Sequence, residues 1–207
     1  MKKIIIVAVI LLVLAPMVFL LMSVLERLPA PRLRAAIKAG ATETVAEIIQ
    51  QNPELITVTN IGDTPLHLAS MLGRDSIVAL LLESGSFVDP HAEQRGSMTP
   101  LLKAAFEGHH STVKLLLSHG ANPNFHGGGG NFTALHTAAV HGRLGMVRTL
   151  IQYGADPASR DDLNRTPLVE ARERGYTKIV AELNAIEHKL LERDITPTNG
   201  PSTQNND

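Results

Sequence analysis

Histidine is the residue type that most suggests chemistry in this sequence, because six of its nine histidines lie between His109 and His141. Imidazole nitrogens bind zinc, but zinc sites need a tight spacing, such as His-x-x-x-His on one helix face, or supporting thiolates. The chain has no cysteine, and these histidines do not have that spacing. We therefore predict no metal site and keep a metal or small ligand in this histidine-rich stretch as the alternative function.

Other patterns that support catalysis are also missing from the sequence. It contains no nucleophile elbow, no paired-carboxylate motif and no redox dithiol. The glycine run at residues 127–130 resembles a phosphate-binding loop only superficially, because no Gly-Lys-Ser or Gly-Lys-Thr follows it. We predict that the protein is not an enzyme, binds no cofactor and has no small-molecule substrate.

The charge balance argues against nucleic acid as a partner. When Lys2, Lys3, Glu26 and Arg27 are set aside, the chain past residue 30 carries 16 Lys and Arg residues and 19 Asp and Glu residues. Binding to nucleic acid depends on an excess of positive charge that neutralises phosphates. A mildly acidic domain is therefore not expected to bind DNA or RNA.

A short string recurs four times and sets the organisation of the chain. Its first copy reads Thr-Pro-Leu-His-Leu-Ala, and the copies are separated by 35, 34 and 33 residues; they begin at Thr64, Thr99, Thr133 and Thr166. In phase with it, a glycine precedes a valine by five residues, and apolar residues follow at helical spacing. These glycines are Gly73, Gly108, Gly142 and Gly175. Two motifs that recur together at one period indicate a repeat protein.

The motif residues indicate where a helix of each unit begins and ends. Thr64 is suited to cap a helix, and Pro65 follows at the first helical position, where its missing N–H costs nothing. Leu66 and Ala69 lie three residues apart on one face, so one fills a core and the other lets a neighbouring helix approach closely. Gly73 can end the helix in the left-handed conformation.

This pattern resembles the ankyrin repeat, whose unit of about 33 residues contains a turn and two helices and whose signature is Thr-Pro-Leu-His-x-Ala. The resemblance covers roughly residues 55 to 190. It implies an all-α solenoid of helix–turn–helix repeats with hairpin loops. It also implies that His67 and His136, at the histidine position of the motif, bond the backbone of turns in neighbouring repeats.

We assign the ankyrin-repeat domain to residues 31–193. A degenerate capping repeat is predicted at residues 31–56, and about four repeats are predicted to start near residues 60, 94, 128 and 161. The polar tail at residues 194–207 has almost no apolar content and is predicted to be disordered.

The N-terminal segment predicts a membrane location. A basic tail at residues 1–3 precedes an apolar run at residues 4–25, and a linker is expected at residues 26–30. The apolar run has 22 residues and no charge, which is enough to cross a bilayer as a helix, although a cleaved export signal is the alternative. We expect a single-pass membrane protein of bacterial type with an exported repeat domain, in the periplasm or outside the cell, or a soluble exported protein after cleavage.

In the family that the repeats resemble, partners bind at the hairpin tips and at exposed positions late in the first helix. The residues just before the motif threonines are Asp63, Met98, Phe132 and Arg165. The late positions of the first helices are Met71, Leu72, Phe106, Glu107, Val140, His141, Glu173 and Arg174. Five of these twelve residues are expected to form an apolar patch, unless several pack on neighbouring repeats: Met71, Met98, Phe106, Phe132 and Val140.

The predicted function is that of a non-enzymatic ankyrin-repeat scaffold that mediates protein–protein interaction at or near a membrane. Its partner is expected to be a protein, and residues 4–25 are expected to contact the membrane. The alternative is an exported protein that binds a small ligand or a metal through the histidine-rich third repeat. The histidines considered as ligands lie between residues 109 and 141: His109, His110, His119, His126 and His141.

Overall fold

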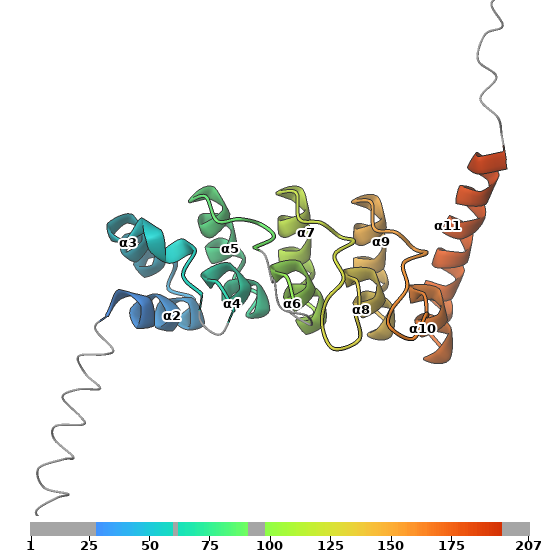
Figure 1. Cartoon of the computed structure of the whole chain (residues 1–207), viewed down its shortest axis with the longest axis horizontal. Helices are drawn as coiled ribbons and strands as arrows, with labels where there is room; N and C mark the ends of the chain where they lie inside the picture. Colours follow the sequence, from blue (N-terminus) through green and yellow to red (C-terminus); the bar gives the residue numbers. More distant parts are fainter. Residues whose placement is uncertain (1–27, 60–61, 91–97, 196–207) are drawn as a thin grey trace, which may run out of the picture.

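The computed structural model describes residues 28–59, 62–90 and 98–195 of the chain. Within these ranges the chain forms pairs of helices that stand side by side in one row (Figure 1). The first helices of the pairs are α2 (Pro29–Ala39), α4 (Pro65–Met71), α6 (Pro100–Glu107), α8 (Ala134–Val140) and α10 (Pro167–Glu173). The second helices are α3 (Thr42–Gln51), α5 (Asp75–Glu83), α7 (His110–Ser118), α9 (Leu144–Gln152) and α11 (Thr177–Ile195). A 3-10 turn, η1 (Pro53–Ile56), follows α3.

The motif threonines begin the first helices, as the sequence predicts. The Thr99 hydroxyl accepts a hydrogen bond from the Leu102 N–H at 3.2 Å, and Thr64, Thr133 and Thr166 cap their helices in the same way. This bond satisfies one of the amides that has no partner within the first turn of a helix. The start of each unit is thus fixed locally.

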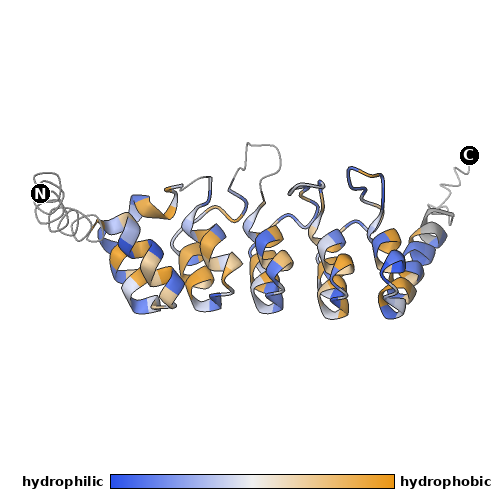
Figure 2. Ribbon diagram, turned by 90° about the horizontal axis from the view of Figure 1, so that it is seen from below, coloured by the Kyte–Doolittle hydropathy of each residue, from blue (hydrophilic) through white to orange (hydrophobic). Residues whose placement is uncertain are grey.

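The core is built from the same motif positions in every repeat. The motif leucines Leu66, Leu101, Leu135 and Leu168 are buried, and the motif alanines Ala69, Ala104, Ala138 and Ala171 are completely buried. A helix that presents alanine to its neighbour can approach it closely, and each first helix contacts the next: α4 with α6, α6 with α8, and α8 with α10. The apolar faces of the helices are seen within the stack in Figure 2, where the hairpins project from one side.

The residue after the left-handed glycine that ends a first helix reaches back to the preceding repeat in three of the units. The Arg74 guanidinium donates to the Lys38 carbonyl at 2.7 Å, His109 Nε2 donates to the Met71 carbonyl at 3.0 Å, and Arg143 donates to the Phe106 carbonyl at 2.9 Å. These carbonyls lie at or near the C-terminal ends of the first helices, where no later residue of the helix bonds them. Each repeat therefore completes the helix end of the one before it.

In the last repeat Tyr176 takes this position and packs its ring against Gly142. Gly142 has a φ of 70°, and a Cβ on it would come within 2.7 Å of the tyrosine ring. Glycine is required there both for the left-handed backbone and for the close approach of the ring.

The third hairpin carries the glycine run. Gly127 and Phe132 exchange two backbone hydrogen bonds of 3.0 and 2.9 Å, and Asn131 closes the turn with a φ of 56°. The Asp162 N–H of the next hairpin donates to the Gly130 carbonyl at 3.1 Å. Apart from this bridge and an isolated bridge position at Asp63, the described residues form no β-structure.

The two ends of the described chain differ in detail from the prediction. Helix α2 begins at Pro29, within the predicted linker at residues 26–30, because prolines are tolerated in the first turn of a helix, where the N–H has no partner in any case. Helix α11 continues to Ile195 and so includes the first two residues of the predicted tail. The predicted basic tail at residues 1–3, the apolar run at residues 4–25 and residues 196–207 of the tail lie outside the described residues. Of the helices that are described, none has both the length and the apolar character to cross a bilayer.

Candidate functional site

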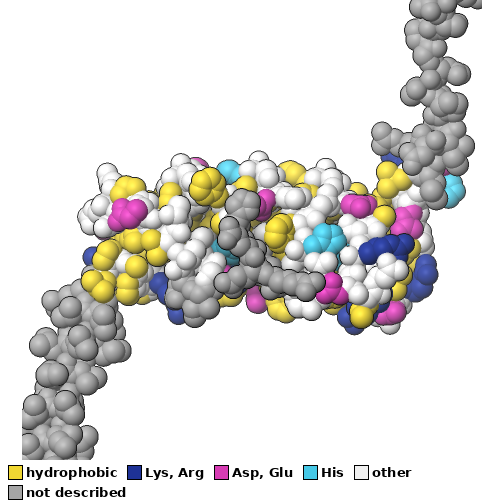
Figure 3. Space-filling model, in the orientation of Figure 1, with side chains coloured by type: hydrophobic (Ala, Val, Ile, Leu, Met, Phe, Trp, Pro, Cys, Tyr) yellow, Lys and Arg dark blue, Asp and Glu magenta, His cyan; other side chains and the backbone are white. Residues whose placement is uncertain are grey.

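The twelve residues predicted to bind a partner come from four successive repeats and define what we call the hairpin–helix surface. Each repeat contributes the residue before its motif threonine and two residues at the end of its first helix. Because α4, α6, α8 and α10 pack in sequence, these positions form consecutive rows along the stack. In Figure 3 hydrophobic side chains gather towards the α2–α4 end, and charged ones gather towards the α10–α11 end.

The centre of the hairpin–helix surface is an aromatic pair from adjacent repeats. Phe106, at the end of α6, is 52% exposed, and its ring meets the ring of His141 edge-on with 5.5 Å between centroids. His141 is also exposed, and its Nδ1 donates to the Thr137 carbonyl at 2.8 Å, which fixes the orientation of its ring. A large aromatic side chain that is held in place yet open to solvent is the kind of residue that contributes most to protein interfaces.

The other apolar members of the predicted patch are less exposed than expected. Met71, Leu72 and Met98 are partly buried and pack against the core. Phe132 is half-buried, and its ring lies 5.7 Å from the buried ring of His136. Of the five apolar side chains in the predicted patch, Met71, Met98 and Phe132 are thus only partly exposed, because helices that pack as closely as these also cover the side chains at their edges. Val140 is half-buried as well.

The last row of the surface is an ionic cluster around Arg165. Its guanidinium lies 2.9 Å from Asp161, 2.6 Å from Glu170 and 3.5 Å from Glu173. The Glu170 side chain is completely buried, and Arg174 approaches its other oxygen at 3.4 Å. Burial alone would raise the pKa of Asp161, but hydrogen bonds from the backbone and guanidinium of Arg165 and from the Leu163 N–H outweigh it, so the pKa is lowered.

The first row carries an ion pair that links two repeats. The Lys103 ammonium lies 3.0 Å from the Asp63 carboxylate, and Glu107 is exposed nearby on α6. Lys103 and Glu170 were missed as candidates because they occupy the fifth position of the motif, which the other copies fill with Leu68 and Thr137. The available signal is that this position is charged in two of the four copies.

The candidate metal ligands are engaged in separate structural bonds. His109 bonds the Met71 carbonyl, His110 Nε2 bonds the Thr149 hydroxyl at 2.8 Å, and His126 Nδ1 bonds the Asn131 carbonyl at 3.0 Å. Within the described ranges, no three side chains of the metal-binding types converge to hold an ion. The geometry therefore offers no support for the alternative function.

The two motif histidines form hydrogen bonds that hold the repeats together, as the resemblance implies. His67 Nδ1 accepts from the Thr64 N–H at 3.1 Å, and His136 Nδ1 accepts from the Thr133 N–H at 3.3 Å. The Nε2 of His136 donates to the Arg165 carbonyl in the next repeat at 3.0 Å. Burial lowers the pKa of His67 to about 4 and also lowers the pKa of His136.

These features define a solenoid of short helical repeats that presents a continuous surface of hairpins and first helices. The model of the single ankyrin repeat matches residues 61–94, and the model of ankyrin repeats in several copies matches residues 86–161 and 126–196. The chain belongs to the ankyrin-repeat family, whose repeats are scaffolds for protein–protein interaction and are generally not enzymes.

Similar segments occur in proteins from plants, bacteria and animals. The chain is 41% identical over 88 residues to XBAT35 of Arabidopsis thaliana, which is named as an E3 ubiquitin-protein ligase; the match covers 42% of this chain and 19% of that protein. It is 40% identical over 76 residues to an ankyrin repeat protein of Rickettsia bellii, and this match covers 36% of the present chain and 31% of the Rickettsia protein. It is 34% identical over 93 residues to ankyrin repeat and SAM domain-containing protein 6 of Mus musculus, and this match covers 44% of the present chain and 10% of the mouse protein. The chain thus spans less than a third of the length of each of these relatives.

Proposed function

We propose that this protein holds a protein partner close to a membrane, that the hairpin–helix surface is the binding face, and that Phe106 with His141 forms its centre. The observation that carries the proposal is the 52% exposure of Phe106 on the first helix of an internal repeat. A buried contact to such a ring removes apolar area from water at little cost in side-chain entropy. The charged residues around Arg165 supply a polar end to the same face.

The binding role predicts a loss of partner when the aromatic pair is removed. Crosslinking in intact membranes followed by affinity capture should recover a specific partner with the wild-type chain. Replacement of both Phe106 and His141 by alanine should lower the recovery by roughly thirty-fold or more, which corresponds to about 2 kcal/mol for a central interface residue.

The matched control for this loss is Tyr153→Ala. Tyr153 is an aromatic residue that is 39% exposed, but it lies directly after α9, a second helix, and away from the hairpin–helix surface. Its replacement should leave the recovered partner unchanged. An equal loss with both variants, or with neither, would contradict the assignment of the binding face.

The membrane location rests on the 22-residue apolar run at residues 4–25 and the basic residues Lys2 and Lys3 before it. We propose that this run anchors the chain and that the repeats lie on the exported side. A reporter that is active only after export, fused to the C-terminus, is expected to be active in the membrane fraction, and the product is expected to keep its full length. A reporter that is inactive would place the repeats on the other side, and a shortened product would identify a cleaved signal.

A further inference from the structure

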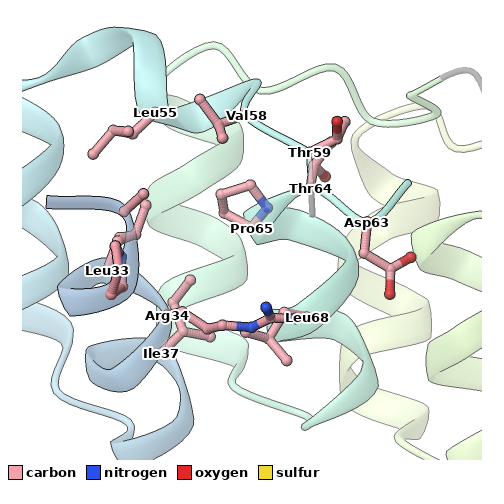
Figure 4. Close-up of a pocket in the computed structure, with 12 residues that line it drawn as sticks. Leu33, Arg34, Ile37, Leu55, Val58, Thr59, Asp63, Thr64, Pro65 and Leu68 are labelled. Carbon is pink, nitrogen blue, oxygen red and sulfur yellow. The ribbon is translucent and has the colours of Figure 1, made fainter. Parts of the chain in front are cut away.

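A groove lies between α2 and α4, the first helices of the two N-terminal helix pairs, beneath the segment that follows η1 (Figure 4). Its volume is about 390 Å³, which is at the small end of the range for ligand sites and suits a few side chains rather than a large cofactor. Leu33 and Ile37 of α2, Leu55 of η1 and Leu68 of α4 form its apolar wall, and Val58, 43% exposed, stands at its rim. The groove therefore offers apolar surface that a partner can cover.

The two charged side chains of the groove differ in whether they already have an ion-pair partner. They are Arg34 and Asp63. Asp63 is already neutralised by its 3.0 Å ion pair with Lys103. Arg34 is half-buried, extends from α2 towards α4 in Figure 4, and has no ion pair or hydrogen bond to any described residue.

A guanidinium that has no partner among the described residues, at the edge of an apolar groove, favours a ligand that brings a negative charge. Guanidinium–carboxylate pairs are among the strongest hydrogen-bonded pairs, particularly where apolar surroundings limit access of water. An apolar ligand without a charge would cover Arg34 and leave it desolvated without compensation. A basic ligand would be repelled.

We infer that this groove binds a segment of a protein partner in which a carboxylate, placed to pair with Arg34, is flanked by apolar side chains that fill the space between α2 and α4. This inference rests on the proposed protein-binding function and adds a second contact at the N-terminal end of the stack. The groove begins at Ala30, only a few residues after the apolar run at residues 4–25. A segment that follows directly on the partner's own membrane anchor therefore fits the position.

The test is a selection from a displayed peptide library on the full chain in lipid nanodiscs, with empty nanodiscs used to remove lipid binders. On the wild type, the selected peptides are expected to share an Asp or Glu within a few residues of Leu, Ile or Phe. On Arg34→Glu the same library is expected to yield Lys or Arg in place of the acid. The wild-type peptides should bind Arg34→Glu, and also Val58→Trp, which fills the rim, at least tenfold more weakly.

The matched control is Arg172→Glu, which makes the same charge change at an exposed position on α10, at the other end of the stack. It should bind the wild-type peptides normally. If Arg34→Glu selects the same acidic peptides, or if no peptide is enriched, the inference is overturned. If selected peptides lose affinity with Phe106→Ala but not with Arg34→Glu, the groove inference fails while the proposed binding face stands. Binding of dodecanoate without any selected peptide would assign the groove to a small amphiphile and would also overturn it.

Discussion

Replacement of Leu135 by alanine is expected to lower the free energy of unfolding by about 2–5 kcal/mol. Leu135 is completely buried in α8, which contacts α6, α9 and α10. The change removes the transfer free energy of the lost side-chain atoms and leaves a cavity that helices held on both sides cannot close. Urea unfolding followed by circular dichroism measures this loss. Hydrogen exchange should show the largest loss of protection in α8 and in the helices it contacts, α6, α9 and α10.

Leu163→Ala provides the same chemical change at a site where burial is absent. Leu163 is 70% exposed in the fourth hairpin, so its replacement should change the free energy of unfolding by less than about 0.5 kcal/mol. Equal destabilisation by the two variants would show that burial in the internal repeats is not the source of stability.

Acidification from pH 6.5 to about pH 4 is expected to destabilise the fold by about 3 kcal/mol through His67 alone, at about 1.4 kcal/mol per pH unit. Burial lowers the pKa of the folded histidine to about 4, while the unfolded chain titrates near 6.5. Above pH 6.5 His67 is neutral in both the folded and the unfolded chain, so its titration does not change the free energy of unfolding. Below pH 6.5 His67 is protonated in the unfolded chain but stays neutral in the folded protein. The free energy of unfolding therefore falls with pH until His67 is protonated in the folded protein as well. His136, whose pKa is also lowered by burial, adds to the loss.

The histidine contribution is measured by comparing urea unfolding at several pH values between 7 and 4.5 for the wild type and His67→Asn. The variant will be less stable at pH 7, because it loses the contacts of the imidazole, but its stability should fall less steeply on acidification. Titrating carboxylates are common to both proteins and cancel in the comparison. His119→Asn, at an exposed position, should keep the wild-type slope. Parallel pH profiles for His67→Asn and the wild type would contradict the assignment.

Features that depend on a single repeat were predictable from the sequence. The threonine caps, the left-handed glycines and the buried Leu66 and Ala69 follow from backbone and side-chain rules that act within a few residues. Repetition of the motif made each of these predictions four times over. The family and the all-helical fold followed from the same residues.

Features that depend on how repeats meet were not predictable. The ion pair between Lys103 and Asp63 joins residues of neighbouring repeats that lie 40 positions apart in the chain, so sequence spacing does not indicate it. Met71 and Met98 are partly buried against the core, and the groove at Arg34 is formed where α2 meets α4. Sequence reasoning proposes the positions of the binding surface but cannot rank their exposure, and among the apolar and aromatic candidates Phe106 and His141 are the exposed ones.

Arg74, His109 and Arg143 each bond the first helix of the preceding repeat, so the completion of a repeat depends on residues that are synthesised later. During synthesis the ribosome releases the chain from the N-terminus, so each first helix emerges before the residue that completes its C-terminal end. A nascent repeat therefore remains unfinished until about one further repeat has left the ribosome, and a chain that stops early ends in a helix whose carbonyls lack their partner.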